Sequence, residues 1–277
     1  MEKAKERLRQ FAAKVLPKKE RLTKERLIIL SLMAVFGIAG IVALVNILSL
    51  QHEYTVAEKE YDELRTLAPE SVVPADDGAT QMADATNDGF TDADNMGLEG
   101  EYLEEEYLPE HNPDYIGWIR IDGTRIDYPV VQGTDNEKYL NTTFGGRRNV
   151  SGAIFMDYRL TERFEAPSTI LYGHNMKNGS MFAGLHRFLD ESFVAADPRI
   201  EIIFPDGTTR IYTVIAAKIT DIHDRAYTML GQDEQAIYDY TLSLDADRAT
   251  GQMLLLSTCT DYNNDDERML VVAAPGK

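Results

Sequence analysis

The chain has 277 residues and a formal net charge of −18 when its five histidines are neutral. This length suits one large domain or two small ones, and a hydrophobic share of 44% is ordinary for a globular protein. No basic face is visible on the part expected to fold, so we expect no nucleic-acid partner.

The N-terminal end has the pattern of a membrane anchor. Residues 1–26 contain ten Lys or Arg against four Glu, whereas residues 27–50 contain no charge. A helix of this length, at ~1.5 Å per residue, spans a hydrocarbon core of about 30 Å. Basic flanks tend to stay in the cytoplasm. We therefore predict a basic cytoplasmic segment at 1–26, a single transmembrane helix at 27–50 in the cell membrane, and an extracellular remainder.

A cleaved signal peptide is the alternative to an uncleaved anchor. Its apolar region would be about 7–15 residues long and would precede a cleavage site with small residues. The apolar run here is longer, and "NILSLQHEY" (46–54) offers no such site. The anchor is therefore the favoured interpretation.

Residues 51–106 are predicted to form a stalk helix followed by an acidic disordered linker. Most of the excess acid lies here, since residues 51–110 carry eighteen Asp or Glu against two basic residues. Residues 70–97 have too few large apolar side chains to offset the entropy of ordering the chain. Residues 98–115 read as a short helix that ends near Pro109 and braces the next domain. We expect a chain starting near residue 98 to fold as one cooperative unit.

From about residue 116, short apolar runs separated by turn signals predict strands. Helical segments are expected between them at 136–141, 180–190 and 233–244. The spacings are too irregular for repeated βαβ crossovers, which favours a mainly β fold of the barrel type. The eight expected strands are 116–121, 125–131, 153–157, 168–173, 200–204, 209–220, 252–259 and 268–274.

Cys259 is the only cysteine, and it stands at the end of a predicted strand. One cysteine cannot form an internal disulfide, so in an exported chain it indicates either intermolecular pairing or a free reactive thiol. The alternative is a small buried hydrophobe, which is common for free cysteine. Composition alone leaves these interpretations open.

A nucleophilic thiolate needs a base or a positive charge nearby, and His174 is the best candidate for the base. It lies just past an apolar strand and after a glycine, where a barrel presents side chains at its rim, although a rim histidine is more often structural than catalytic. His52 adjoins the predicted membrane span, and His111 lies in the brace. His186 lies in a predicted packed helix and His223 in a loop.

Arg268 opens the last predicted strand, after the acidic stretch "DYNNDDE" (261–267), and could point back toward Cys259. An arginine stays protonated and cannot act as a base. It can bind a peptide carbonyl and stabilise the oxyanion that forms when a thiolate attacks it. A solvated strand end is the alternative.

Three motifs in order carry a resemblance to the sortases, the membrane-anchored cysteine transpeptidases of Gram-positive bacteria. "LSTC" (256–259) resembles the family's T-L-x-T-C signature, "YGHN" (172–175) resembles its histidine motif, and Arg268 matches its arginine. The segment 112–141 and the helix at 233–244 are most similar to class B. The resemblance implies an eight-stranded sortase-type β-barrel with inserted helices as the catalytic domain, at 107–277.

The resemblance also implies roles for individual residues. Cys259 would be the nucleophile, His174 the acid and base, and Arg268 the carbonyl and oxyanion clamp. The substrate contacts would be Thr258, Ser257 and Tyr172. The implied partners are exported proteins with C-terminal sorting signals, and an amine of a peptidoglycan precursor or a pilin as acceptor. We expect no cofactor and no metal, because the excess acid lies in the linker.

Two other functions fit the same sequence. A cysteine peptidase would use the same groups but release its product to water. A non-enzymatic anchored binding module would merely pack Cys259. Within the sortase interpretation, cell-wall anchoring and pilus polymerisation both stay open, as does the pentapeptide.

Overall fold

The computed structural model describes residues 24–70, 108–261 and 264–276. Most of the predicted cytoplasmic segment and the predicted linker at 70–97 lie outside these residues. The chain divides into two compact units between His52 and Glu53, and each is described by itself below.

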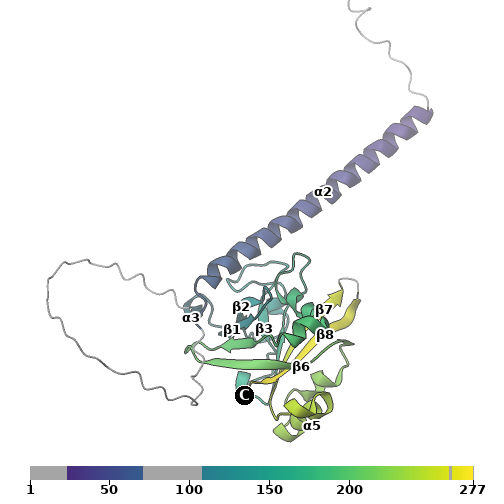
Figure 1. The fold of residues 1–277 in the computed structure, drawn as a ribbon. Helices are drawn as coiled ribbons and strands as arrows, with labels where there is room; N and C mark the ends of the chain where they lie inside the picture. The colour runs from purple at the N-terminus through teal and green to yellow at the C-terminus, as the bar shows by residue number, and fades with distance from the viewer. Residues whose placement is uncertain (1–23, 71–107, 262–263, 277) are drawn as a thin grey trace, which may run out of the picture. The chain divides into compact units, whose positions relative to one another are not determined.

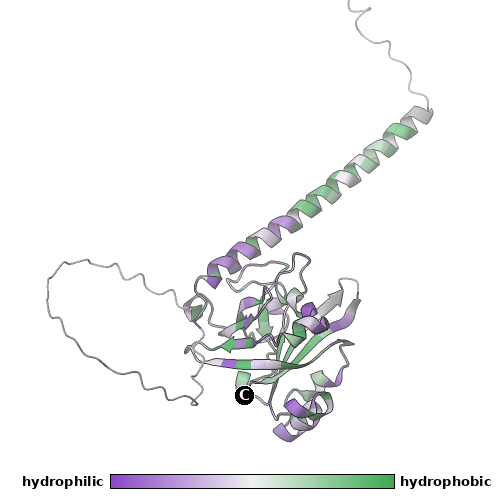
Figure 2. Cartoon of the chain, viewed as in Figure 1, coloured by the Kyte–Doolittle hydropathy of each residue, from purple (hydrophilic) through white to green (hydrophobic). Residues whose placement is uncertain are grey.

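The first unit is the apolar part of one helix, α2 (Lys24–Arg65). Its large side chains are exposed, for example Phe36 at 73%, and Figure 2 shows a long hydrophobic stretch on this helix. Among the described residues, α2 alone is long and apolar enough to cross a membrane. Exposed apolar surface of this extent is unusual for a soluble protein. The predicted transmembrane segment at 27–50 therefore coincides with a candidate membrane span.

The second unit is built on a closed eight-stranded barrel (Figure 1), which confirms the mainly β prediction. The strand order around the barrel is β1-β2-β3-β4-β7-β8-β6-β5. The strands are β1 (Tyr115–Ile121), β2 (Asp127–Val131), β3 (Ile154–Met156), β4 (Ser168–Tyr172), β5 (Ile200–Ile203), β6 (Thr209–Asp221), β7 (Met253–Asp261) and β8 (Asn264–Pro275).

Strand β7 forms part of the barrel wall between β4 and β8. It pairs in parallel with β4 and antiparallel with β8. Its residues Leu254, Leu255 and Leu256 are all fully buried. A strand alternates its side chains between two faces, so a run of three buried leucines means that both faces of β7 are covered. One cover is the 3-10 helix η3 (Phe182–Leu189), which contacts β7 and β8.

The other helices among the described residues are short; the first precedes β1, and the others lie between strands. They are α3 (Leu108–His111), η1 (Lys138–Leu140), η2 (Arg163–Glu165), α4 (Glu191–Ala195), η4 (Arg225–Met229), α5 (Glu234–Leu244) and η5 (Ala246–Arg248). The three predicted helical segments appear as η1, η3 and α5. Of the predicted brace at 98–115, residues 98–107 lie outside the described residues. The described part contains the short helix α3.

Helix α5 begins at a side-chain cap, since the Asp233 carboxylate accepts a hydrogen bond from the Ala236 amide at 2.9 Å. Its residues Ile237 and Tyr240 are buried, as the helical spacing predicts. Tyr238, directly after Ile237, is 41% exposed. Neighbouring positions on a helix differ by ~100°, so Ile237 and Tyr238 cannot both face the core.

The C-terminal turns of α2 belong to the barrel unit, because three of their side chains lie in the same core as the strands. The hydroxyl of Tyr61 donates to the Gly152 carbonyl at 2.6 Å. The compact unit therefore begins at Glu53, well before the expected domain start at residue 107. The three core side chains are Ala57, Tyr61 and Leu64.

A chain that starts at residue 98 is therefore expected to be less stable than one that starts at Glu53. The shorter chain loses the buried ring of Tyr61, and losing a buried aromatic side chain costs about 3–5 kcal/mol. Urea unfolding of both chains measures the difference. Tyr61→Phe in the longer chain is the control, since loss of one hydrogen bond costs about 1 kcal/mol. Equal midpoints for the two chains would support the predicted boundary near residue 107.

Candidate active site

The parallel pairing of β4 and β7 brings the predicted histidine and cysteine positions together. Tyr172 on β4 lies opposite Ser257 on β7, and the Gly173 amide continues the pairing by donating to the Ser257 carbonyl at 3.3 Å. His174 and Cys259 each stand two residues further along. Since parallel strands end at the same edge of a sheet, both positions emerge at one rim of the barrel.

Arg268 lies directly across from the nucleophile position on the other side of β7. The antiparallel pairing of β7 and β8 sets Cys259 opposite Arg268. Opposed residues on antiparallel strands have Cβ atoms about 4.5–5.5 Å apart on one face. One guanidinium nitrogen of Arg268 donates to the Glu267 carbonyl at 3.0 Å. The Cys259 side chain itself lies outside the described part of the structure, so its position is given by the backbone.

A cavity of about 200 Å³ opens at this rim. Five of the six site residues predicted from the sequence line it: Tyr172, His174, Ser257, Thr258 and Arg268. Gly173, between Tyr172 and His174, also lines it, and the other lining residues come from earlier parts of the chain: Asn136, Leu140 and Phe155. The fold therefore collects the predicted residues at one cavity.

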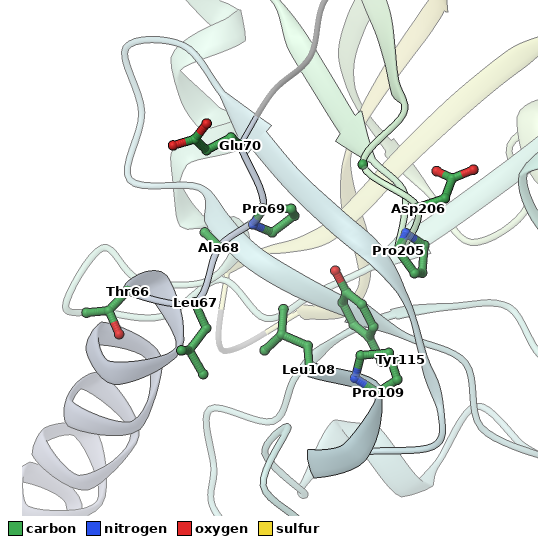
Figure 3. Close-up of a pocket in the computed structure, with 11 residues that line it drawn as sticks. Thr66, Leu67, Ala68, Pro69, Glu70, Leu108, Pro109, Tyr115, Pro205 and Asp206 are labelled. Carbon is green, nitrogen blue, oxygen red and sulfur yellow. The ribbon is translucent and has the colours of Figure 1, made fainter. Parts of the chain in front are cut away.

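Larger cavities open elsewhere on the barrel unit, but none of the predicted site residues lines them. One of about 510 Å³ lies between the end of α2, helix α3 and the turn at Pro205–Gly207 (Figure 3). Its labelled lining side chains include Leu67, Leu108 and Tyr115, and no histidine or cysteine lines it. The kinds of residues, rather than the size of the cavity, identify the candidate active site.

The imidazole of His174 is oriented by a backbone carbonyl. Its Nε2 lies 2.7 Å from the Leu140 oxygen, and a carbonyl can only accept, so Nε2 carries the proton. In the neutral ring, Nδ1 is then free to take a proton. In the imidazolium form, Nδ1 can give that proton back while Nε2 stays bonded to Leu140. The carbonyl thus assigns proton transfer to Nδ1.

Two glycines allow the close packing that this arrangement needs. Gly152 has a φ of +55°, and a Cβ there would lie 2.7 Å from the Leu140 carbonyl oxygen. A Cβ on Gly173 would lie 2.5 Å from Cδ1 of Ile154. Only glycine fits at either position without moving its neighbours. The Leu140 carbonyl is the group that orients His174.

The predicted substrate contacts have different hydrogen-bonding states. The Ser257 hydroxyl is 2.8 Å from the hydroxyl of Tyr227 on η4. The Thr258 hydroxyl is buried and has no hydrogen-bond partner among the described residues. Leaving a buried hydroxyl unpaired costs about 1–3 kcal/mol, so Thr258 would gain from a bound ligand. Tyr172 turns its hydroxyl to Asp157 at 3.2 Å.

Sequence reasoning missed several residues at or beside the cavity. Asn136 and Leu140 lie in a predicted helical segment, and Tyr227 lies on η4, a 3-10 helix that no motif marked. Phe155, whose ring centroid is 5.4 Å from that of Tyr172, was assigned only to a strand. The sequence offered one signal for the residues around the cavity. This signal was Asp157, an acidic residue at the end of the apolar run 153–157. The described residues contain no group of three or more His, Cys, Asp or Glu that could hold a metal ion.

The closed eight-stranded barrel has the fold of the cysteine transpeptidases known as sortases. A family model described as the Sortase domain matches residues 119–276, more than half of the chain, and the chain therefore belongs to the sortase family. A curated relative, sortase B of Listeria monocytogenes, is 33% identical over 193 residues, which cover 65% of this chain and 77% of the relative.

Solved structures agree with this assignment. The X-ray structure of Clostridium perfringens sortase B aligns with a TM-score of 0.54 at 27% identity, covering 62% of this chain and 100% of that one. A Staphylococcus aureus sortase B–substrate complex aligns with a TM-score of 0.52 at 31% identity, covering 61% and 83%. These class B relatives support a sortase-type cysteine transpeptidase of class B.

Proposed function

We propose that this chain cleaves a sorting pentapeptide after threonine and transfers the exported protein that bears it to an amine. The observation that carries the proposal is the meeting of His174, Arg268 and the Cys259 position at one rim cavity. The Staphylococcus aureus sortase B–substrate complex supports a protein substrate for the family.

In the first step, the thiolate of Cys259 attacks the threonine carbonyl. A C–S bond forms, and the carbonyl oxygen becomes an oxyanion that the guanidinium of Arg268 stabilises. When the C–N bond breaks, Nδ1 of the His174 imidazolium gives its proton to the leaving amine. The product is a thioester acyl-enzyme and a neutral His174.

In the second step, an amine attacks the thioester carbonyl and Nδ1 of His174 takes the proton that the amine loses. The C–S bond breaks, a new amide forms, and Cys259 leaves as a thiolate beside the imidazolium. A peptidoglycan precursor or a pilin would supply the amine. Thr258, Ser257 and Tyr172 line the cavity and would contact the peptide.

The test is turnover of a fluorogenic peptide with a Thr–Gly or Thr–Asn junction, with and without an amine acceptor. Mass analysis separates the transferred product from the hydrolysed one. We expect the amide product to dominate when the amine is present. Water as the sole acceptor in both reactions would instead favour a cysteine peptidase.

Arg268→Lys is expected to lower kcat/KM by at least about tenfold, because lysine keeps the charge but loses the planar fork of donors. The same fluorogenic assay measures it. Arg187→Lys, on the exposed side of η3, is the matched control and is expected to keep normal turnover. Near-normal rates for Arg268→Lys would remove Arg268 from the active site.

The chain is proposed to be anchored by α2, with residues 1–26 in the cytoplasm and the barrel outside the cell. Protease added to intact cells is then expected to cut within 70–97 and release a soluble catalytic domain. Immunoblotting with an antibody against the barrel checks the release. Protection of this segment in intact cells, with cleavage only after lysis, would contradict the orientation.

A further inference from the structure

A buried carboxylate lies directly behind the wall of the active-site cavity. Asp157 follows β3 and is fully buried. Its Oδ2 accepts hydrogen bonds from Nδ2 of Asn136 at 2.9 Å and from the Tyr172 hydroxyl at 3.2 Å. Asn136 and Tyr172 both line the cavity, whereas Asp157 does not. One carboxylate oxygen therefore joins two side chains of the wall.

The carboxylate determines which polar atoms Asn136 and Tyr172 can present to a ligand in the cavity. An ionised carboxylate only accepts, so Asn136 must turn its NH₂ group, and Tyr172 its hydroxyl hydrogen, toward Asp157. On its other side, Oδ1 of Asn136 accepts from the Tyr158 amide at 3.1 Å. The Asn136 amide thus cannot flip without losing two hydrogen bonds, and Tyr172 can offer only its lone pairs to a ligand.

The other carboxylate oxygen is held from outside the cavity. Oδ1 of Asp157 accepts from the backbone amide of Arg159 at 3.0 Å and from its Nε at 2.9 Å, and Nη2 of Arg159 reaches Oδ2 at 2.8 Å. Burial on its own raises the pKa of Asp157, but the hydrogen bonds from Arg159 and Asn136 outweigh it and hold the pKa below its usual value. The acceptor is therefore charged and rigid.

We propose that Asp157 is a positioning residue of the sortase reaction, acting through the orientation of Asn136 and Tyr172 on the cavity wall. The inference rests on the proposed function, since its effect is on how the sorting peptide is held for attack. Small errors in the placement of a reacting carbonyl are costly, and a misplacement of about 1 Å can reduce the rate about a hundredfold.

A purely structural role for Asp157 makes different predictions. The carboxylate and Arg159 would then only stabilise the turn after β3, where Nε2 of Gln132 also donates to the Asp157 carbonyl at 3.0 Å. Loss of the carboxylate would lower the melting temperature without a selective effect on the peptide. It would also act independently of Asn136.

The experiment uses the full chain in detergent and compares Asp157→Asn with Glu201→Gln. Glu201 is the matched control because it is also a buried carboxylate, lies 3.8 Å from the guanidinium groups of Arg120 and Arg199, and does not line the cavity. We expect Asp157→Asn to lower kcat/KM for the peptide at least about tenfold, mainly by lowering kcat, because the reacting carbonyl is misplaced. Glu201→Gln should change only the melting temperature.

A double-mutant cycle decides between positioning and stability. If Asp157 acts through Asn136, the effect of Asp157→Asn on kcat/KM should shrink by at least about threefold in an Asn136→Ala background. Full additivity, or equal losses for Asp157→Asn and Glu201→Gln, would overturn the inference while wild-type turnover stands. Absence of wild-type turnover would overturn the proposed function and this inference with it.

Should Asp157→Asn fail to fold, Tyr172→Phe replaces it, because it removes one hydrogen bond to the carboxylate and little buried volume. Two side chains held by one oxygen should be coupled, so the losses of kcat/KM for Tyr172→Phe and Asn136→Ala should again be non-additive. Independent losses would show that the carboxylate does not make them one unit.

Discussion

Cys259→Ala is expected to abolish formation of the acyl-enzyme completely. The chain contains one cysteine, so no second thiol can take over the attack, and alanine has no group that forms a thioester. Intact-protein mass spectrometry after incubation with the sorting peptide measures the result. The wild-type chain should gain the mass of the acyl fragment, and the variant should keep its own mass.

A thiol reagent gives an independent control on Cys259. A reactive thiolate beside positive charge alkylates quickly, whereas a buried structural cysteine reacts slowly. Rapid labelling of Cys259 in a chain that forms no acyl-enzyme would show that the thiol is reactive but that the chain lacks sortase activity. An acylated Cys259→Ala variant would show that another residue is the nucleophile.

His174→Ala should lower kcat by at least about 10²-fold, the usual contribution of a positioned general acid or base. The thiol remains, but the leaving amine loses its proton donor and the acceptor amine loses its base. Steady-state turnover of the fluorogenic peptide with an amine acceptor measures the loss. The amide product of the wild-type chain serves as the reference.

His186→Ala is the matched control for this experiment. His186 lies in η3 and its Nδ1 is 3.3 Å from the Ala183 carbonyl, outside the cavity. Its replacement should change turnover by no more than about twofold, as for most substitutions away from a site. Near-normal turnover of His174→Ala would show that His174 is not the acid and base of this reaction.

The strands, the long apolar helix and the three candidate site residues were all predicted from the sequence. The strands were predictable because apolar runs bounded by turn residues are local signals. The roles of Cys259, His174 and Arg268 came from short motifs and family resemblance. The barrel then followed, since eight strands with irregular spacing leave few other architectures.

The residues that support that site could be found only from the three-dimensional packing of the barrel. The bond from His174 to the Leu140 carbonyl joins residues 34 positions apart, and the contact between Tyr61 and Gly152 spans 91 positions. Asp157 meets Asn136 from 21 positions away. Hydrogen bonds over such separations leave no periodic pattern in the sequence, because they depend on where the closed barrel returns each loop rather than on neighbouring residues.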